Sequence, residues 1–329
     1  MFITRTPFRI TFGGGGTDLP SFYKKHGGFI FCGAIDKYMF ISVNRPIIDD
    51  LIRIKYSESE TMSSIHEVRH DIARECCKMM GIERAIEIIS MADVPAGTGL
   101  GSSSCYAVGL LNALHSLKRD YISLKELAEE ACSIEIDILK KPIGKQDHYI
   151  ATFGGLMVLE IDRDGTVEVR SAGLKPDTIE RLESNILLFY EGTSRNSNAI
   201  LADQSKKAEQ ERGPVVDSMF RIKEIGRRIL KVMENGQLNE FGELMHEHWM
   251  AKKRISDKMS NFRIDEIYEA ARASGALGGK IMGAGGGGFF MFYCENSNKY
   301  KLRKVMQENG LRELRYHFDF EGTKVLANF

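Results

Sequence analysis

Hydrophobic and polar positions alternate at the start of the chain and then adopt a helical period. The alternation over residues 2–12 predicts a β-strand, which the glycines of residues 13–16 end. The short strands predicted before the first long helix cover residues 2–12, 29–31, 38–43 and 51–56. From Ile65 apolar residues recur at helical spacing, which predicts one helix that stops at Gly81. The first half of the chain is therefore expected to be α+β.

Apolar residues cover most sides of the segment 102–117, which predicts a buried helix. A second helix is expected over about 123–139, where Ser123 and Glu126 are spaced for a capping box. An irregular polar loop is expected over residues 140–155. The strands predicted around these segments cover residues 85–91, 155–161, 167–170 and 186–190.

Helical patterns dominate residues 196–274, and the chain then returns to strand over residues 278–294. One further helix and two short strands are expected after that. The change of character near residue 180 predicts two domains, which are residues 1–180 and 181–329.

Composition narrows the classes of partner. The chain has 329 residues, of which 43% are hydrophobic, and this is enough for a sizeable core. Its 45 basic and 45 acidic residues balance, which argues against nucleic acid or a membrane surface bound through bulk charge. The six cysteines show no C-x-x-C pair, and the uncharged, glycine-rich stretch at residues 281–294 is too short to span a membrane. We expect a cytoplasmic protein.

The segment 95–105, PAGTGLGSSSC, is the best candidate for chemistry. Three glycines alternate through it and three serines follow, directly before the predicted buried helix. Glycine lets the backbone approach a ligand closely, and the free N–H groups of a helix N-terminus attract anions, so this loop is expected to bind phosphate. It matches neither a Walker A loop nor a dinucleotide fingerprint. A glycine-rich turn with a serine helix cap is the alternative interpretation.

Two other motifs match chemical signatures only formally. The sequence from His66 to His70 fits H-E-x-x-H, but no third zinc ligand stands out and the neighbouring positions are charged. The run from Gly283 to Gly288 fits G-x-G-x-x-G, but a strand follows it where a dinucleotide site needs a helix. Neither motif is taken as a site.

Three separated motifs together resemble the GHMP kinases, named for galactokinase, homoserine kinase, mevalonate kinase and phosphomevalonate kinase. They are GGGGTD at residues 13–18, P-x-x-x-G-L-G-S-S-S at residues 95–104, and KIMGAGGGG at residues 280–288. The resemblance spans nearly the whole chain. It implies an α+β fold of two domains, the first like ribosomal protein S5 and the second ferredoxin-like with added helices, and it implies ATP and Mg²⁺ as cofactors.

The resemblance also implies roles for particular residues. Asp147 falls at the catalytic aspartate, in a local pattern where His148 replaces the usual glutamine, and Arg9 falls at the family's N-terminal basic residue. Ser103 and Glu135 fall at the metal ligands, with Asp137 as the alternative acid. The nucleotide-binding residues implied are Pro95, Gly97, Thr98, Gly99, Leu100, Gly101, Ser102, Ser103 and Ser104. Each of the two catalytic candidates has an alternative interpretation. Asp147 could be a loop carboxylate that caps local N–H groups, and Arg9 could be a surface cation.

The choice of sugar rests on further resemblance. Galactose is disfavoured, because Gly15 and Gly16 stand where galactokinases have a Glu-His pair. The segments 191–201 and 247–256 look like the heptose and fucose kinase branch of the family. This implies phosphorylation of an anomeric hydroxyl, with a heptose 7-phosphate as the expected substrate. The alternatives are an unphosphorylated sugar such as fucose, or a silent sugar sensor, which the intact Asp147 disfavours.

A sugar phosphate calls for local cations. The basic candidates are Arg195, Lys252, Lys253, Arg254 and Lys280. Arg195 and Lys280 are favoured. The alternative interpretation of each candidate is a surface charge without a role in binding. The full set of substrate residues expected is Gly15, Gly16, Thr17, Asp18, Gln146, His148, Arg195, Lys280, Gly283 and Gly285. The expected partners are ATP and the sugar phosphate, and the expected assembly is a monomer or a homodimer.

Overall fold

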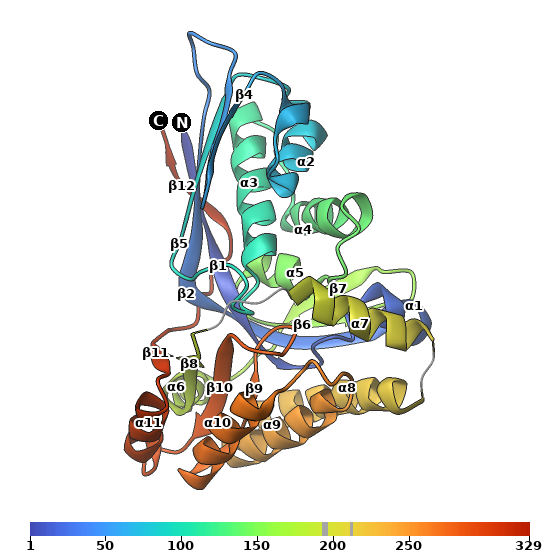
Figure 1. Ribbon diagram of the computed structural model, residues 1–329, viewed down its shortest axis with the longest axis vertical. Coiled ribbons are helices and arrows are strands. Elements are labelled where there is room, and N and C mark those ends of the chain that lie inside the picture. Colours follow the sequence, from blue (N-terminus) through green and yellow to red (C-terminus); the bar gives the residue numbers. More distant parts are fainter. Residues whose placement is uncertain (193–196, 211–212) are drawn as a thin grey trace.

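The computed structural model describes residues 1–192, 197–210 and 213–329, which build two β-sheets with helices packed on them (Figure 1). The larger sheet has eight strands within the described residues, in the order β12-β1-β2-β5-β3-β4, with β6 and β7 attached to β2. Its strands are β1 (Phe2–Gly13), β2 (Gly28–Asn44), β3 (Ile52–Lys55), β4 (Ser59–Met62), β5 (Ile86–Ala92), β6 (Leu156–Ile161), β7 (Val167–Ser171) and β12 (Lys324–Asn328).

Strand β2 organises the larger sheet because it is long enough to serve two neighbours on one edge. Its first part, from Gly28 to Gly33, pairs with β6, and its last part, from Met39 to Asn44, pairs with β5, while β1 runs along the other edge. Apart from the parallel pair of β3 and β5, the ladders are antiparallel. The segments 29–31 and 38–43, predicted as separate strands, are therefore parts of one strand.

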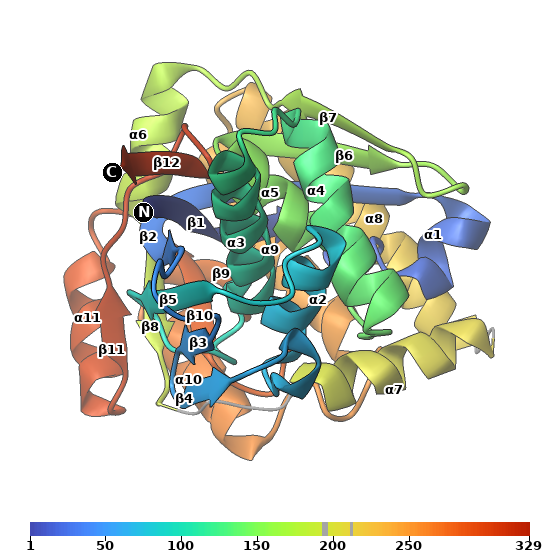
Figure 2. The same cartoon turned by 90° about the horizontal axis from the view of Figure 1, so that it is seen from above.

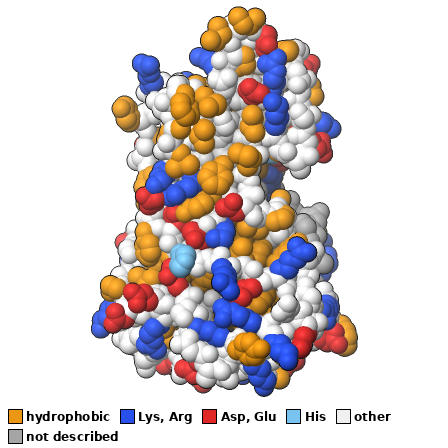
Figure 3. Space-filling model, turned by 90° about the vertical axis from the view of Figure 1, so that its left-hand side faces the viewer, with side chains coloured by type: hydrophobic (Ala, Val, Ile, Leu, Met, Phe, Trp, Pro, Cys, Tyr) orange, Lys and Arg blue, Asp and Glu red, His pale blue; other side chains and the backbone are white. Residues whose placement is uncertain are grey.

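Helices cover one face of this sheet. Helix α3 (Ser102–Lys118) packs on β1 and β2, and its outer sides meet α2, α4 and α5 (Figure 2). The bounds of these neighbours are α2 (Asp71–Met79), α4 (Leu124–Cys132) and α5 (Gln146–Phe153), with a π-helical turn (Ser133–Ile138) after α4. A helix enclosed in this way is apolar nearly all round, as predicted. Figure 3 shows the side of the molecule that lies on the left in Figure 1, away from α3. Hydrophobic side chains gather there over the larger sheet.

The smaller sheet has the order β11-β8-β10-β9 and is antiparallel. Its strands are β8 (Ile186–Tyr190), β9 (Ala276–Ile281), β10 (Phe289–Cys294) and β11 (Arg312–Leu314). The helices packed around it are α6 (Pro176–Asn185), α8 (Gly213–Glu234), α9 (Leu238–Lys253), α10 (Phe262–Ala273) and α11 (Lys299–Glu308). Helix α9 packs on β9, α8 packs on α9 and also reaches β1 and β2, and α7 (Ser197–Glu209) packs on α1 (Pro20–His26).

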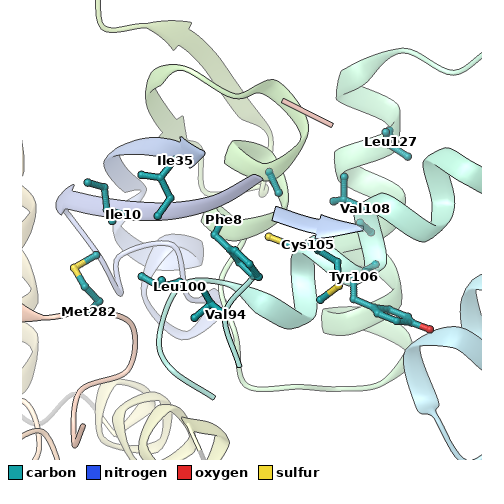
Figure 4. Close-up of a cluster of buried hydrophobic side chains, with 14 of the residues drawn as sticks. Phe8, Ile10, Ile35, Val94, Leu100, Cys105, Tyr106, Val108, Leu127 and Met282 are labelled. Carbon is teal, nitrogen blue, oxygen red and sulfur yellow. The ribbon is translucent and has the colours of Figure 1, made fainter. Parts of the chain in front are cut away.

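The apolar core continues from one sheet toward the other. Phe8 of β1 and Cys105 of α3 belong to one buried cluster, which Met282 enters from the loop between β9 and β10 (Figure 4). Strand β12 also pairs with β1, so residues 324–328 lie in the larger sheet. The division of the chain at residue 180 stays a prediction. No helix in the described part of the chain combines the length and apolar character needed to cross a membrane.

Three local predictions were wrong. The helix predicted from Ile65 is divided: a 3₁₀ turn (Ile65–Glu67) comes first, and α2 begins at Asp71 because the His70 ring nitrogen caps it by accepting from the Ala73 N–H at 3.2 Å. The loop expected over residues 140–155 contains α5, whose apolar residues are buried against the sheet. Helix α6 was missed, although a proline at its first position is a typical start signal.

The division of the predicted helix also removes the zinc motif. His66 lies in the 3₁₀ turn and is exposed, whereas His70 caps α2, so the two do not share one helix face. Within residues 1–192, 197–210 and 213–329, no group of three or more His, Cys, Asp or Glu side chains is arranged to hold a metal ion.

Helix α8 approaches the larger sheet at a contact between glycines. A Cβ atom on Gly226 would lie 2.8 Å from the Gly14 nitrogen, and one on Gly13 would lie 2.5 Å from the Gly226 Cα. We expect Gly226→Ala to lower the free energy of unfolding by about 1–3 kcal/mol through overpacking, although alanine favours helix by about 1 kcal/mol. The measurement is the urea unfolding midpoint.

Gly213→Ala is the matched control, because a Cβ at this position of α8 meets nothing within 4 Å. It should leave the unfolding midpoint unchanged or slightly raised. Equal midpoints for the two variants would show that the glycine contact does not hold α8 against the sheet.

Candidate active site

A cleft of about 800 Å³ is lined by residues of both sheets. The larger sheet contributes Arg9 and Thr11 of β1, and the smaller sheet contributes Lys280 of β9. The segment before α3 and the glycine loop after β9 also line it, as do the first residues of α5. The three motifs that are far apart in the sequence therefore meet in one place.

The glycine loop before α3 needs its glycines. Gly97, Gly99 and Gly101 all have positive φ, at 77°, 90° and 90°, which disfavours other residues. A Cβ on Gly99 would lie 2.7 Å from the Met282 carbonyl oxygen, so this loop and the loop after β9 touch through their backbones. Gly101 immediately precedes the first turn of α3, a helix of 17 residues whose N–H groups and dipole favour an anion at this end.

The predicted nucleotide residues divide into two groups. Those that line the cleft are Pro95, Gly97, Gly99, Gly101, Ser102, Ser103 and Ser104. The other two shape the loop from behind: the Thr98 hydroxyl donates to the Pro95 carbonyl at 3.0 Å, and Leu100 is buried in the core. Thr98 and Leu100 thus fix the backbone that the cleft residues present.

Arg9 and Asp147 form a bidentate ion pair. The guanidinium donates through Nε and Nη2 to the two carboxylate oxygens, each at 2.7 Å, and through Nη1 to the Gly99 carbonyl at 2.6 Å. Arg9 is almost completely buried, whereas 21% of the Asp147 side chain is exposed. A Cβ on Gly101 would lie 3.2 Å from Asp147 Oδ2. The carboxylate is therefore held with fixed orientation directly beside the start of α3.

Asp18 is a buried carboxylate that backbone groups hold. Its oxygens accept from the N–H groups of Gly16 at 3.1 Å and Gln146 at 3.0 Å. Burial raises the pKa of Asp18 to about 6, partly offset by the bond from Gln146, and the Asp147 charge raises it further. Gly144 makes room for it, since a Cβ there would lie 2.0 Å from Asp18 Oδ2.

Thr17 and His148 were predicted to bind substrate, but the structure buries both side chains. The Thr17 hydroxyl donates to the Phe29 carbonyl at 2.8 Å and accepts from the Phe29 N–H at 3.0 Å, so it fixes the loop before α1. His148 is fully buried, and its Nε2 bonds to Glu135 at 2.9 Å. Both side chains support the site from inside the core.

The predicted metal ligands Ser103 and Glu135 are not brought together. Ser103 is exposed at the cleft, whereas Glu135 is fully buried and its Oε2 accepts from the neighbouring Ser104 hydroxyl at 3.0 Å. Burial opposes the charge on Glu135, but His148, Lys141 and Ser104 together hold its pKa below the ordinary value. As placed, this carboxylate does not fit a Mg²⁺ site that opens to the cleft.

Some of the remaining predicted substrate residues line the cleft and others do not. Gly15, Gly16 and Gln146 line the cleft with Asp18, and so do Lys280 and Gly283. Gly285 instead packs against Met259, since its Cβ would lie 2.7 Å from the Met259 sulfur. Arg195 lies outside the described residues, and Asp137 is exposed on the π-helical turn.

Sequence reasoning missed some residues of the cleft wall. Those with side chains that carry hydrogen-bonding groups include Thr11, His70, Gln204 and His248. Gln204 approaches the first motif, because a Cβ on Gly16 would lie 2.6 Å from Gln204 Nε2. His248 stands in the segment 247–256 whose resemblance to sugar kinases was noted, and that segment was the available signal.

Comparison with known proteins identifies the family of this chain. Residues 67–155 match the family model of the GHMP kinases N terminal domain, and residues 229–311 match that of the GHMP kinases C terminal domain, together more than half of the chain. The chain belongs to the GHMP kinase family, which consists of ATP-dependent phosphotransferases. The predicted family, enzyme class and two-domain α+β fold are confirmed.

Two of the similar proteins are sugar kinases. The D-glycero-alpha-D-manno-heptose 7-phosphate kinase of Campylobacter jejuni is 28% identical over 98% of this chain and 96% of its own length. The L-fucokinase/L-fucose-1-P guanylyltransferase of Bacteroides fragilis is 24% identical over 93% of this chain and 36% of its own length.

A solved structure of a D-glycero-D-manno-heptose 1-phosphate kinase from Bacteroides thetaiotaomicron has the same fold. It is 22% identical, covers 100% of both chains and superimposes with a TM-score of 0.82.

The raised pKa of Asp18 makes a prediction about stability. Protonated Asp18 favours the folded state, so its contribution is fully present below the ordinary pKa of 3.8 and is lost as the pH rises through about 6. Asp18→Asn removes this titration. The free energy of unfolding of the variant, relative to the native chain, should rise between about pH 4 and pH 7 by at most about 3 kcal/mol.

Denaturant unfolding at several pH values measures this difference. Asp137→Asn, which removes an exposed carboxylate, is the control for the loss of one negative charge. A difference between Asp18→Asn and the native chain that stays constant over this pH range would contradict the assignment.

Proposed function

We propose that this kinase transfers a phosphoryl group from ATP to the anomeric hydroxyl of a heptose 7-phosphate. The observation that carries the proposal of a hydroxyl kinase is the Asp147 carboxylate, fixed by Arg9 beside the start of α3 and partly open to the cleft. The choice of sugar is supported by the Campylobacter jejuni relative, whose name states heptose 7-phosphate. The family alone supports only a small acceptor with a hydroxyl group.

In this proposal Asp147 is the general base. Its carboxylate orients the acceptor hydroxyl and takes the hydroxyl proton as the acceptor oxygen bonds to the γ-phosphorus, while the bond from that phosphorus to the bridging oxygen breaks and ADP leaves. Arg9 keeps both carboxylate oxygens in place, and its bond to the Gly99 carbonyl fixes the base relative to the glycine loop. Most of the catalytic effect then comes from positioning two reactants in a fixed geometry.

The residues of the cleft fit ATP. The bound nucleotide would supply the phosphoryl group, and the N–H groups of the glycine loop and of the first turn of α3, which border the cleft, would hold its phosphates. The proposal keeps Mg²⁺ as the counter-ion of the triphosphate, although Glu135, one of its two predicted protein ligands with Ser103, is buried and does not fit the metal as placed. Of these two, Ser103 faces the cleft.

On the acceptor side, the proposal assigns Asp18 to bind sugar hydroxyls, with Gly15 and Gly16 allowing close approach. Gln146 is held beside it, since the Thr11 hydroxyl donates to Gln146 Oε1 at 2.9 Å. A cytoplasmic location is part of the proposal, because the six cysteines are free and buried. An unphosphorylated sugar such as fucose is the second candidate acceptor, supported by the Bacteroides fragilis relative.

A substrate panel with ATP and Mg²⁺ tests the proposed acceptor. We expect kcat/KM for heptose 7-phosphate to exceed that for heptose and fucose by roughly tenfold or more, because a charged group that binds contributes more than about 1.4 kcal/mol. The product is identified by its ³¹P spectrum as an anomeric phosphate. Equal or better turnover of the unphosphorylated sugars would reject the heptose phosphate assignment.

The role of Asp147 is tested by Asp147→Asn. Turnover should fall by roughly 10²–10⁴-fold, while binding of a nucleotide analogue persists, because the amide cannot take the proton but keeps the size of the side chain. Single-turnover kinetics and calorimetric nucleotide titration measure the two effects. Asp177→Asn is the control, because Asp177 is an exposed aspartate that also stands in the first turn of a helix. Near-normal turnover of the Asp147 variant would remove it as the base.

A further inference from the structure

One wall of the cleft carries three basic side chains that are almost completely buried. His248 and Lys252 lie one turn apart on α9, and Lys280 lies on β9, on which α9 packs. They are 1%, 8% and 3% exposed, and all three line the cleft. Basic side chains are seldom buried to this degree unless they are paired.

Lys280 and His248 leave hydrogen-bonding capacity unused within the described residues. Lys280 Nζ donates to the Phe12 carbonyl at 3.2 Å, and within the described residues it forms no ion pair with a carboxylate. Neither ring nitrogen of His248 has a partner among those residues. Lys252 donates to the carbonyls of Ile281 and Gly283. Buried polar groups without partners are costly, so this wall is built for something other than stability.

The electrostatics of the wall point to an anion. Burial lowers the pKa of Lys280, and the nearby charges of Lys252 and Arg9 lower it further. Burial also lowers the pKa of His248, with Lys280 and Lys252 as the next causes. The charged forms of both side chains are therefore disfavoured, by burial and by repulsion from the neighbouring cations. A bound anion would supply the missing negative charge.

Two anions enter the cleft in the proposed reaction, namely the nucleotide phosphates and any phosphate on the acceptor. The nucleotide phosphates already have a dedicated site, which is the glycine loop and the N-terminus of α3. The three basic side chains belong to other elements, α9 and β9, and face the cleft from the C-terminal part of the chain. Arg9 is close enough to influence Lys280, which places the wall next to the Arg9–Asp147 pair.

We propose that His248, Lys252 and Lys280 form a subsite for the phosphate monoester that the sugar carries before the reaction. This inference rests on the proposed function. In it, the lysine ammonium groups and one imidazole N–H donate to the phosphate oxygens, while the anomeric hydroxyl at the other end of the sugar lies at Asp147. The subsite would therefore select phosphorylated sugars over free ones.

The test compares Lys280→Met and His248→Leu with the native enzyme. We expect the ratio of kcat/KM for heptose 7-phosphate to that for heptose to fall roughly 10- to 100-fold, because each variant removes a hydrogen bond to a charged group. Inorganic phosphate should inhibit the native enzyme competitively with the sugar phosphate, and the variants should weaken this inhibition by a similar factor. Lys253→Met is the matched control, because Lys253 neighbours Lys252 on α9 but pairs with Asp265 at 3.0 Å.

Thermal unfolding separates this role from a structural one. Removing a buried charge that has no carboxylate partner should leave the Tm of Lys280→Met unchanged or raised, whereas a structural lysine would lower it. If Lys280→Met does not fold, Lys252→Gln provides the same kinetic comparison. Equal losses with both sugars, together with a raised KM for ATP, would overturn the proposal in favour of the transferred phosphoryl group.

Failure of the subsite and failure of the proposed function give different results. If the native enzyme prefers free sugars, the heptose phosphate assignment fails, yet competition by inorganic phosphate still tests the subsite. If the native enzyme prefers heptose 7-phosphate and the variants keep both that preference and the phosphate inhibition, the subsite is rejected and the proposed function stands.

Discussion

Two glycine loops touch through their backbones, and the geometry of the candidate active site depends on that contact. Gly99 and Gly283 each leave room for the other loop, and Phe289 at the start of β10 donates its N–H to the Thr98 carbonyl at 3.2 Å. Side chains at these positions would hold the two loops apart. The contact joins the glycine loop before α3, which packs on the larger sheet, to the loop that follows Lys280 in the smaller sheet. A cleft shared by two sheets keeps a fixed shape only where they meet this closely.

Charge is distributed within the cleft in a way that the balanced composition hides. Arg9 and Asp147 neutralise each other, Asp18 is a buried carboxylate held by backbone N–H groups, and Lys280 is a buried cation without a carboxylate partner in the described residues. In the proposed reaction, the fixed pair would orient the base, Asp18 would bind hydroxyl groups, and Lys280 would attract phosphate. Low solvent access makes each of these effects stronger than it would be at the surface.

The sequence predicted those features that depend on local patterns. The capping box of Ser123 and Glu126 forms as expected, α3 has nearly the predicted bounds, and Arg9 and Asp147 meet although 138 positions separate them. The failures arise from long-range packing. His148 bonds to a buried glutamate, and His248 joins Lys252 and Lys280 in one wall of the cleft, and both arrangements depend on contacts between separate elements that spacing alone does not reveal. The predicted helix from Ile65 divided because a capping histidine competed with the apolar period.

The pairing of β12 with β1 has a consequence for how the chain acquires its fold. Residues 2–5 pair on one edge with residues 324–328, and the first and last described residues lie side by side (Figure 1). At roughly 5–20 residues per second, protein synthesis takes tens of seconds to pass from one strand to the other. During that time the outer edge of β1 has no partner, and an open edge is a template for wrong pairing. The strand that carries Arg9 is thus made long before the strand that completes its outer edge.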